Sequence, residues 1–181
     1  MILISAGHYP EAKGASFGNF NEHDEAVIWA KLIAAMLGKD ALVIPTGTPR
    51  QKIDFINEYH KRIPVTAAIE IHFNSAMDSQ GNHVGSGCET LFCPGSMRGH
   101  VLAEAVHAQL IKVFKPDRGI KEGWYKMDPM NGPDAFLSKT AMPAIIMEPE
   151  FIHRVDNIKN HREEGCFAIA HGLESFLLEK D

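Results

Sequence analysis

Short apolar runs alternate with longer segments of helical periodicity, and this alternation restricts the chain to a few architectures. Apolar runs at residues 1–5, 41–45 and 66–73 are separated by helical patterns at about 22–37 and 49–62. Strands and helices that alternate in this way predict βαβ units, in which parallel strands form a sheet and helices cover its faces. We therefore expect an α/β sandwich that is largely parallel at its start, with helices on both faces.

The second half of the chain continues this pattern. Further short segments lie at 89–93, 118–123 and 144–148, the last of them strongly apolar, and helices are predicted near 97–114 and 166–178. A chain of 181 residues with 45% hydrophobic content can build a core without disulfides. We expect one domain that spans the whole sequence, with its three cysteines free.

The composition argues against several classes of protein. A net charge of -5 and the lack of a basic stripe argue against a nucleic-acid partner. No apolar run approaches the roughly 18 residues of a membrane span, so membrane insertion is not expected. The N-terminus also lacks the basic region and long apolar stretch of a signal peptide. We expect synthesis in the cytoplasm without a signal peptide.

Four residues that can bind or assist a metal ion stand where predicted strands or helices meet loops. His8 follows the first strand, His72 follows the third, and Glu148 ends the most apolar strand, while Glu22 opens the first helix. In a mainly parallel sheet, ligands bind beyond the carboxyl ends of the strands, where loops converge. A hydrolytic zinc ion needs about three protein ligands, an open position and a nearby carboxylate. The placement suggests a zinc hydrolase.

The periodicity of the first helix indicates which of its first residues can be metal ligands. Asn21 is the predicted N-cap, and Gly38 is predicted to follow the last turn. At about 100° per residue, Glu22 and His23 lie near the core stripe, whereas Glu25 points away from it. Glu22 and His23 are therefore rival inward ligands, and Glu25 is expected in solvent beside the helix dipole.

Four motifs match one family in order and spacing: SAGH at 5–8, NEHD at 21–24, EIHFNS at 70–75 and MPAIIMEPEF at 142–151. Together they resemble the zinc-dependent N-acetylmuramoyl-L-alanine amidases of bacteria and their phages, over nearly the whole chain. The resemblance implies a three-layer α/β sandwich of the phosphorylase/hydrolase-like kind, with a mostly parallel six-stranded sheet and helices on both faces. It makes residues 1–181 a single amidase catalytic domain.

The same resemblance assigns roles to the candidate residues. It makes His8, Glu22 and His72 the ligands of one Zn²⁺ ion per chain and makes Glu148 the catalytic carboxylate. Family members hydrolyse the amide bond between N-acetylmuramic acid and L-alanine in peptidoglycan, with water activated by zinc and the carboxylate. The implied partner is thus a muramoyl-peptide substrate in the cell wall.

Asn74 and Arg118 are weaker candidates, for substrate contacts, and a purely structural role has equal weight for each. The chain departs from the family pattern at residues 9–11, where a Gly-rich turn is usual, and at 149–151, where the family often continues Glu-Thr-Gly-Phe. Both departures leave the metal and acid positions intact. They bear on substrate preference, because these loops line the groove.

Two alternatives remain open. A related zinc exopeptidase would also use two histidines, a glutamate and a separate catalytic glutamate, with a closely spaced His-x-x-Glu ligand pair. A catalytically inactive wall-binding module would have no need of Glu148. Action on the cell wall without an export signal is the behaviour expected of a phage or prophage lysin.

Overall fold

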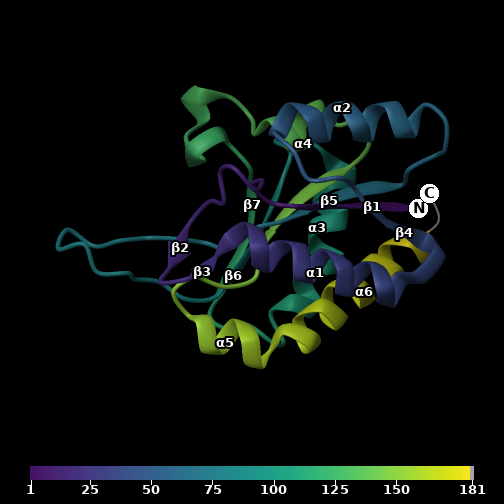
Figure 1. Cartoon of the computed structure of the whole chain (residues 1–181). Coiled ribbons are helices and arrows are strands. Elements are labelled where there is room, and N and C mark those ends of the chain that lie inside the picture. The colour runs from purple at the N-terminus through teal and green to yellow at the C-terminus, as the bar shows by residue number, and fades with distance from the viewer. Residues whose placement is uncertain (180–181) are drawn as a thin grey trace.

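A six-stranded sheet forms the centre of the protein in the computed structural model, which describes residues 1–179 (Figure 1). In spatial order, the strands are β4 (Ala41–Val43), β1 (Ile2–Ala6), β5 (Ala67–Ile71), β8 (Ala144–Glu148), β6 (Cys88–Phe92) and β7 (Asp117–Glu122). Neighbouring strands are parallel, except that β6 is antiparallel to β8. The predicted α/β class and the mostly parallel six-stranded sheet are confirmed.

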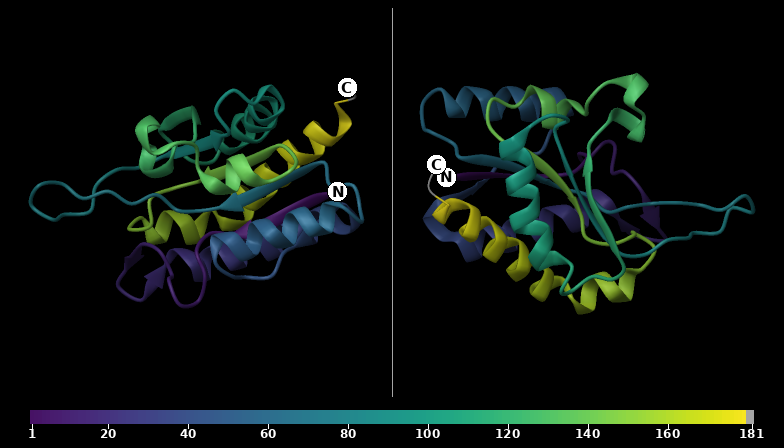
Figure 2. Two further views of the ribbon diagram at one scale, coloured as in Figure 1. Left: turned by 90° about the horizontal axis from the view of Figure 1, so that it is seen from above. Right: turned by 180° about the vertical axis from the view of Figure 1, so that it is seen from behind.

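Helices cover both faces of this sheet, as Figures 1 and 2 show. One face carries α1 (Glu22–Leu37), α3 (Met97–Leu110) and α6 (Arg162–Leu178), and the other carries α2 (Pro49–His60) and α4 (Ala135–Lys139). An apolar core lies on each face of the sheet. The central strands contribute side chains to both cores, because successive residues of a strand point to opposite faces. In β1, Ile2 and Ile4 lie in the larger core, and Leu3 lies in the smaller one on the α2 side.

The two predicted caps of α1 are present. The side chain of Asn21 accepts a hydrogen bond from the amide of Asp24 at 2.9 Å. Gly38 follows the last turn with a φ of 57°, a left-handed conformation that glycine adopts without strain. The N-cap fixes where α1 begins, so it also fixes the position of Glu22, the first residue of the helix.

Several short elements were not predicted, because two to six residues are too few to show a period. They are the hairpin of β2 (Ser16–Phe17) and β3 (Phe20–Asn21), the helices α4 and α5 (Val155–Asn160), and two 3-10 turns at Tyr125–Met127 and Pro129–Asn131. Figure 1 shows the loop after β5 extending away from the sheet as a long arm. Within residues 1–179, no helix is long and apolar enough to cross a membrane.

Candidate metal centre and active site

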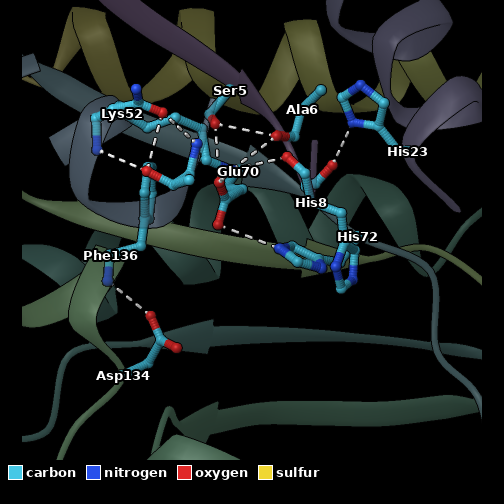
Figure 3. Close-up of polar contacts among 12 residues, drawn as sticks. Ser5, Ala6, His8, His23, Lys52, Glu70, His72, Asp134 and Phe136 are labelled. Carbon is cyan, nitrogen blue, oxygen red and sulfur yellow. Dashed lines mark hydrogen bonds and ion pairs between the residues drawn. The ribbon is translucent and has the colours of Figure 1, made fainter. Parts of the chain in front are cut away.

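His8, Glu22 and His72 converge beyond the carboxyl ends of β1 and β5. His8 lies two residues beyond β1, and His72 directly follows β5. Glu22 bridges the two imidazoles, with Oε2 3.0 Å from His8 Nε2 and Oε1 2.8 Å from His72 Nδ1. One ligand atom from each residue lies within 4.8 Å of the other two. Figure 3 shows the rings of His8 and His72 beside each other.

Two glycines permit this close approach. A Cβ at Gly7 would lie 2.8 Å from the ring of His72. Gly14 has a φ of 75°, and a Cβ there would collide with the ring of His8 and the carboxylate of Glu22. Gly14 was not predicted as part of the site, because a glycine in a polar loop gives no sign of what it faces. The loop around Gly14 therefore shapes the candidate metal centre.

Glu22 is held in its charged form despite burial. Burial alone would raise the pKa of this carboxyl, but hydrogen bonds with His72 and His8 outweigh it and bring the pKa far below the usual range. The backbone amides of Ala15 and Phe73 also donate to its two oxygens, at 3.0 and 3.1 Å. Glu22 is thus a fixed negative group with one oxygen directed at each histidine.

This donor set fits a divalent metal ion. Two imidazole nitrogens and one carboxylate oxygen are a ligand set of catalytic zinc sites, which keep a further position for water or substrate. The side chain of His8 is 34% exposed, so the cluster is open to solvent on that side. His8, Glu22 and His72 can therefore hold a metal ion and leave it accessible.

Glu148 lies near this cluster but in a different environment. Burial raises its pKa to about 8, and the charges of Glu22 and Glu89 act in the same direction against the lowering effect of His72. Its Oε2 is a buried atom without a hydrogen-bond partner among the described residues. Glu148, His8 and His72 line one cavity of about 370 Å³. A larger groove of about 520 Å³ between α1, α3 and α6 contains none of these residues.

The rival ligand His23 turns away from the cluster. Its ring is buried, and its Nδ1 lies 2.8 Å from the carbonyl oxygen of Gly7. The expectation for Glu25 was wrong, because this residue is buried rather than solvated. Its carboxylate accepts hydrogen bonds from Trp29 and Arg162. Helix α6 packs beside α1, so the buried arc of α1 is wider than its apolar stripe indicates.

Asn74 and Arg118, the weaker candidates, both contact the buried carboxylate of Glu89. Asn74 Nδ2 donates to it at 2.6 Å and Arg118 Nε at 3.2 Å. Lys121 also pairs with this carboxylate. Glu89 lies opposite Glu148 in the register of β6 and β8. Asn74 and Arg118 therefore lie near Glu148, because both contact Glu89. Substrate contact by either residue stays a prediction.

The sequence did not point to a buried charged pair next to His72. Glu70, in the middle of β5, is bonded to His72, Ser5 and Lys52, as Figure 3 shows. Glu22 and Glu70 contact the two ring nitrogens of His72, and these contacts outweigh burial and raise its pKa well above the usual value. A glutamate inside an apolar strand was the available signal, because such a charge needs a partner.

The exopeptidase alternative expected a His-x-x-Glu ligand pair. Glu11 follows His8 with this spacing. It is exposed and lies outside the group of possible metal ligands. In the described structure the carboxylate between the histidines comes from Glu22 instead, 14 residues after His8 along the chain.

Comparison with known proteins identifies the family of the chain. The family model of N-acetylmuramoyl-L-alanine amidases matches residues 2–170. The chain belongs to this amidase family. Its members act on peptidoglycan and generally depend on a metal, and His8, Glu22 and His72 form a group that could hold a metal ion. Among curated proteins, none matches the chain.

Solved amidase structures share the fold. An N-acetylmuramoyl-L-alanine amidase from Clostridium difficile 630 is 23% identical with a TM-score of 0.80, and the match covers 99% of this chain and 97% of that one. The amidase AmiC2 of Nostoc punctiforme is also 23% identical, with a TM-score of 0.78 and 98% and 97% coverage. The catalytic domain of an endolysin that targets Clostridia difficile is 22% identical, with a TM-score of 0.74 and 96% coverage of both chains.

Proposed function

We propose that this amidase hydrolyses the bond between N-acetylmuramic acid and L-alanine with one zinc ion held by His8, Glu22 and His72, and that Glu148 transfers the proton. The carboxylate of Glu148 carries this proposal. It is buried, one of its oxygens is without a partner among the described residues, and it lines the same cavity as the two histidines. An unsatisfied buried carboxyl is destabilising, and such groups concentrate at functional sites.

The two carboxylates have separate tasks. Glu22, with its lowered pKa, stays negative and supplies a ligand between the histidines. A zinc ion held by these residues would supply Lewis-acid activation of the water and of the amide carbonyl. Glu148 accepts a proton from the attacking water and donates it to the nitrogen that leaves as the C–N bond breaks. Nearby positive charge lowers a carboxyl pKa, so a bound cation favours the form of Glu148 that accepts the proton.

The rest of the cavity suits a ligand with both sugar and peptide parts. Its lining includes the apolar side chains of Phe136 and Ile146 and the aromatic residues Trp124 and Tyr125. Lys126 adds a positive charge that can meet a carboxylate of the peptide stem. A mainly apolar pocket with a few polar groups is typical of small-ligand sites.

Product analysis of digested peptidoglycan tests this function. Zinc-loaded protein is expected to release stem peptides that begin with a free L-alanine amine and to leave intact glycan strands, and a chelator should stop the reaction. Mass spectrometry of both fractions checks this. Cleavage within the stems would indicate an exopeptidase, and binding to walls without any release would indicate a wall-binding module.

We also propose that the enzyme acts on the wall as an endolysin does. The shared fold with an endolysin catalytic domain supports this. Purified protein added to isolated cell walls should lower their turbidity without a second protein. Turbidity that falls only when a separate wall-binding protein is supplied would contradict this proposal.

A further inference from the structure

Glu70 is a buried charge in a central strand, where an apolar residue is often at least as stabilising. It lies in β5, between β1 and β8, where its register partners are Ser5 and Ile146. Moving a carboxylate and an ammonium out of water costs several kcal/mol per ion, and an apolar pair of similar size is often as stable. Glu70 shares one face of β5 with His72, because the two residues are two positions apart along the chain. The pair therefore stands directly behind a proposed metal ligand.

The contacts of Glu70 divide between its two oxygens. Oε2 lies 3.1 Å from Nε2 of His72, on the side of the ring opposite to Glu22. Oε1 accepts from the hydroxyl of Ser5 at 2.8 Å and pairs with Lys52. One oxygen is thus held by other groups, and the second is directed at the imidazole.

Lys52 extends this support to the other histidine segment. Its ammonium donates to the carbonyl oxygen of Ala6 at 3.0 Å and lies 3.5 Å from the carbonyl oxygen of His8. Lys52 comes from α2, and its side chain is 3% exposed. A single buried ion pair therefore contacts both chain segments that carry the histidines (Figure 3).

We infer that Glu70 is a positioning residue for the metal centre: it accepts the Nε2 proton of His72, so that Nδ1 presents its lone pair beside Glu22 and His8. Lys52 balances the charge of Glu70. The inference rests on the proposed metal site. A carboxylate behind a ligating histidine fixes its tautomer and ring orientation and makes the ligand more basic, and loss of such a partner typically weakens metal binding by about 10- to 100-fold.

Zinc affinity, measured by competition with a chromophoric chelator, tests this role without reference to activity. Glu70→Gln is expected to bind zinc about 10- to 100-fold more weakly than the wild type. Glu25→Gln is the matched control, because Glu25 is also a buried, ion-paired carboxylate, but its partners are Trp29 and Arg162. The control should lose stability and keep the wild-type zinc affinity.

Two further measurements keep the test decisive. Long-range ¹H–¹⁵N spectra of the zinc-loaded wild type should show the His72 proton on Nε2. The double variant Lys52→Met with Glu70→Met removes both buried charges, so it should fold even if Glu70→Gln does not. It should also bind zinc more weakly than Glu25→Gln.

The outcomes separate this inference from the proposed function. Wild-type protein that binds no zinc would overturn both. If the wild type binds zinc and the Glu70 variants bind zinc as tightly as Glu25→Gln does, the positioning role alone is overturned. A His72 proton found on Nδ1 in the zinc-loaded protein would do the same.

Discussion

The cluster around Glu22 and the surroundings of Glu148 are neighbouring parts of one site, and they treat a buried carboxylate in opposite ways. Glu22 receives hydrogen bonds on both oxygens, from imidazoles and backbone amides. Glu148 leaves one oxygen without a partner in the described structure. The pKa of Glu22 is far below its usual range, and that of Glu148 is raised to about 8.

This contrast suits the two chemical tasks proposed for these residues. A metal ligand has to remain charged and fixed in place, which hydrogen bonds to its charged form ensure. A proton-transfer group has to exchange a proton near the working pH, which burial achieves by moving the pKa upward. The same residue type can therefore serve both tasks within one cavity, because its surroundings differ.

Removal of the Glu22 carboxylate, the proposed ligand, should have the largest effect on zinc binding. In Glu22→Ala the two histidines lose the group that joins them, so zinc affinity should fall by at least about 100-fold, more than loss of an outer partner causes. Hydrolysis should fall with it to the background rate. Metal content after dialysis, measured by mass spectrometry, checks the first expectation.

His23→Ala is the matched control for this variant. His23 is the next residue of α1 and is equally buried, but its Nδ1 contacts the Gly7 carbonyl. The variant should retain zinc. Zinc that stays with Glu22→Ala and leaves His23→Ala would exchange the roles of the two residues.

A substitution at Gly14, beside the cluster, has a smaller predicted effect on zinc binding. Gly14→Ala places a methyl group against His8 and Glu22, so zinc should bind about 10- to 100-fold more weakly. Gly18→Ala is the control, because Gly18 has a similar left-handed φ of 59° and nothing within 4 Å of an added Cβ. Both variants carry about 1–2 kcal/mol of backbone strain. Equal zinc affinity in the two variants would show that contact with the cluster is unimportant.

The smallest predicted effect is a change in how stability depends on pH. The folded pKa of Glu148 is about 8, above the roughly 4.3 of an unfolded glutamate, so the folded state holds the extra proton between these values. This group therefore makes the free energy of unfolding of the metal-free protein fall as pH rises through that window. Glu148→Gln removes the contribution.

Chemical denaturation in a chelator checks this prediction. The free energy of unfolding of Glu148→Gln minus that of the wild type should be larger near pH 8 than near pH 5. The raised pKa of His72 also lowers stability as pH rises, and His72 is present in both proteins, so the difference between their profiles reports the loss of the Glu148 carboxyl together with its interaction with His72. Parallel stability profiles would mean that the carboxyl of Glu148 is ordinary.

Much of the site could be predicted because local rules decide it. Strand ends located His8, His72 and Glu148, and they meet because the carboxyl ends of β1, β5 and β8 are adjacent in the sheet. Helical phase placed Glu22 inward. The alternation of apolar runs and helices predicted the sheet, although it did not show that β6 runs antiparallel to β8.

The rest depends on contacts between distant segments. Glu25 is buried by Arg162, which lies 137 residues away along the chain, so the periodicity of α1 alone misplaced it. Lys52 meets Glu70 only because α2 packs on the face of β5 that carries the glutamate. Gly14 is confined by two residues that are themselves brought together by the fold. Sequence periodicity carries no information on these pairings.

The division of labour between the two carboxylates is tested most directly by zinc content and hydrolysis rate measured on the same preparation of Glu148→Gln. The account predicts one zinc ion per chain, wild-type zinc affinity, and a rate of L-alanine amine release that is lower by about 100- to 10,000-fold. A variant that keeps its zinc and hydrolyses peptidoglycan near the wild-type rate would contradict the account.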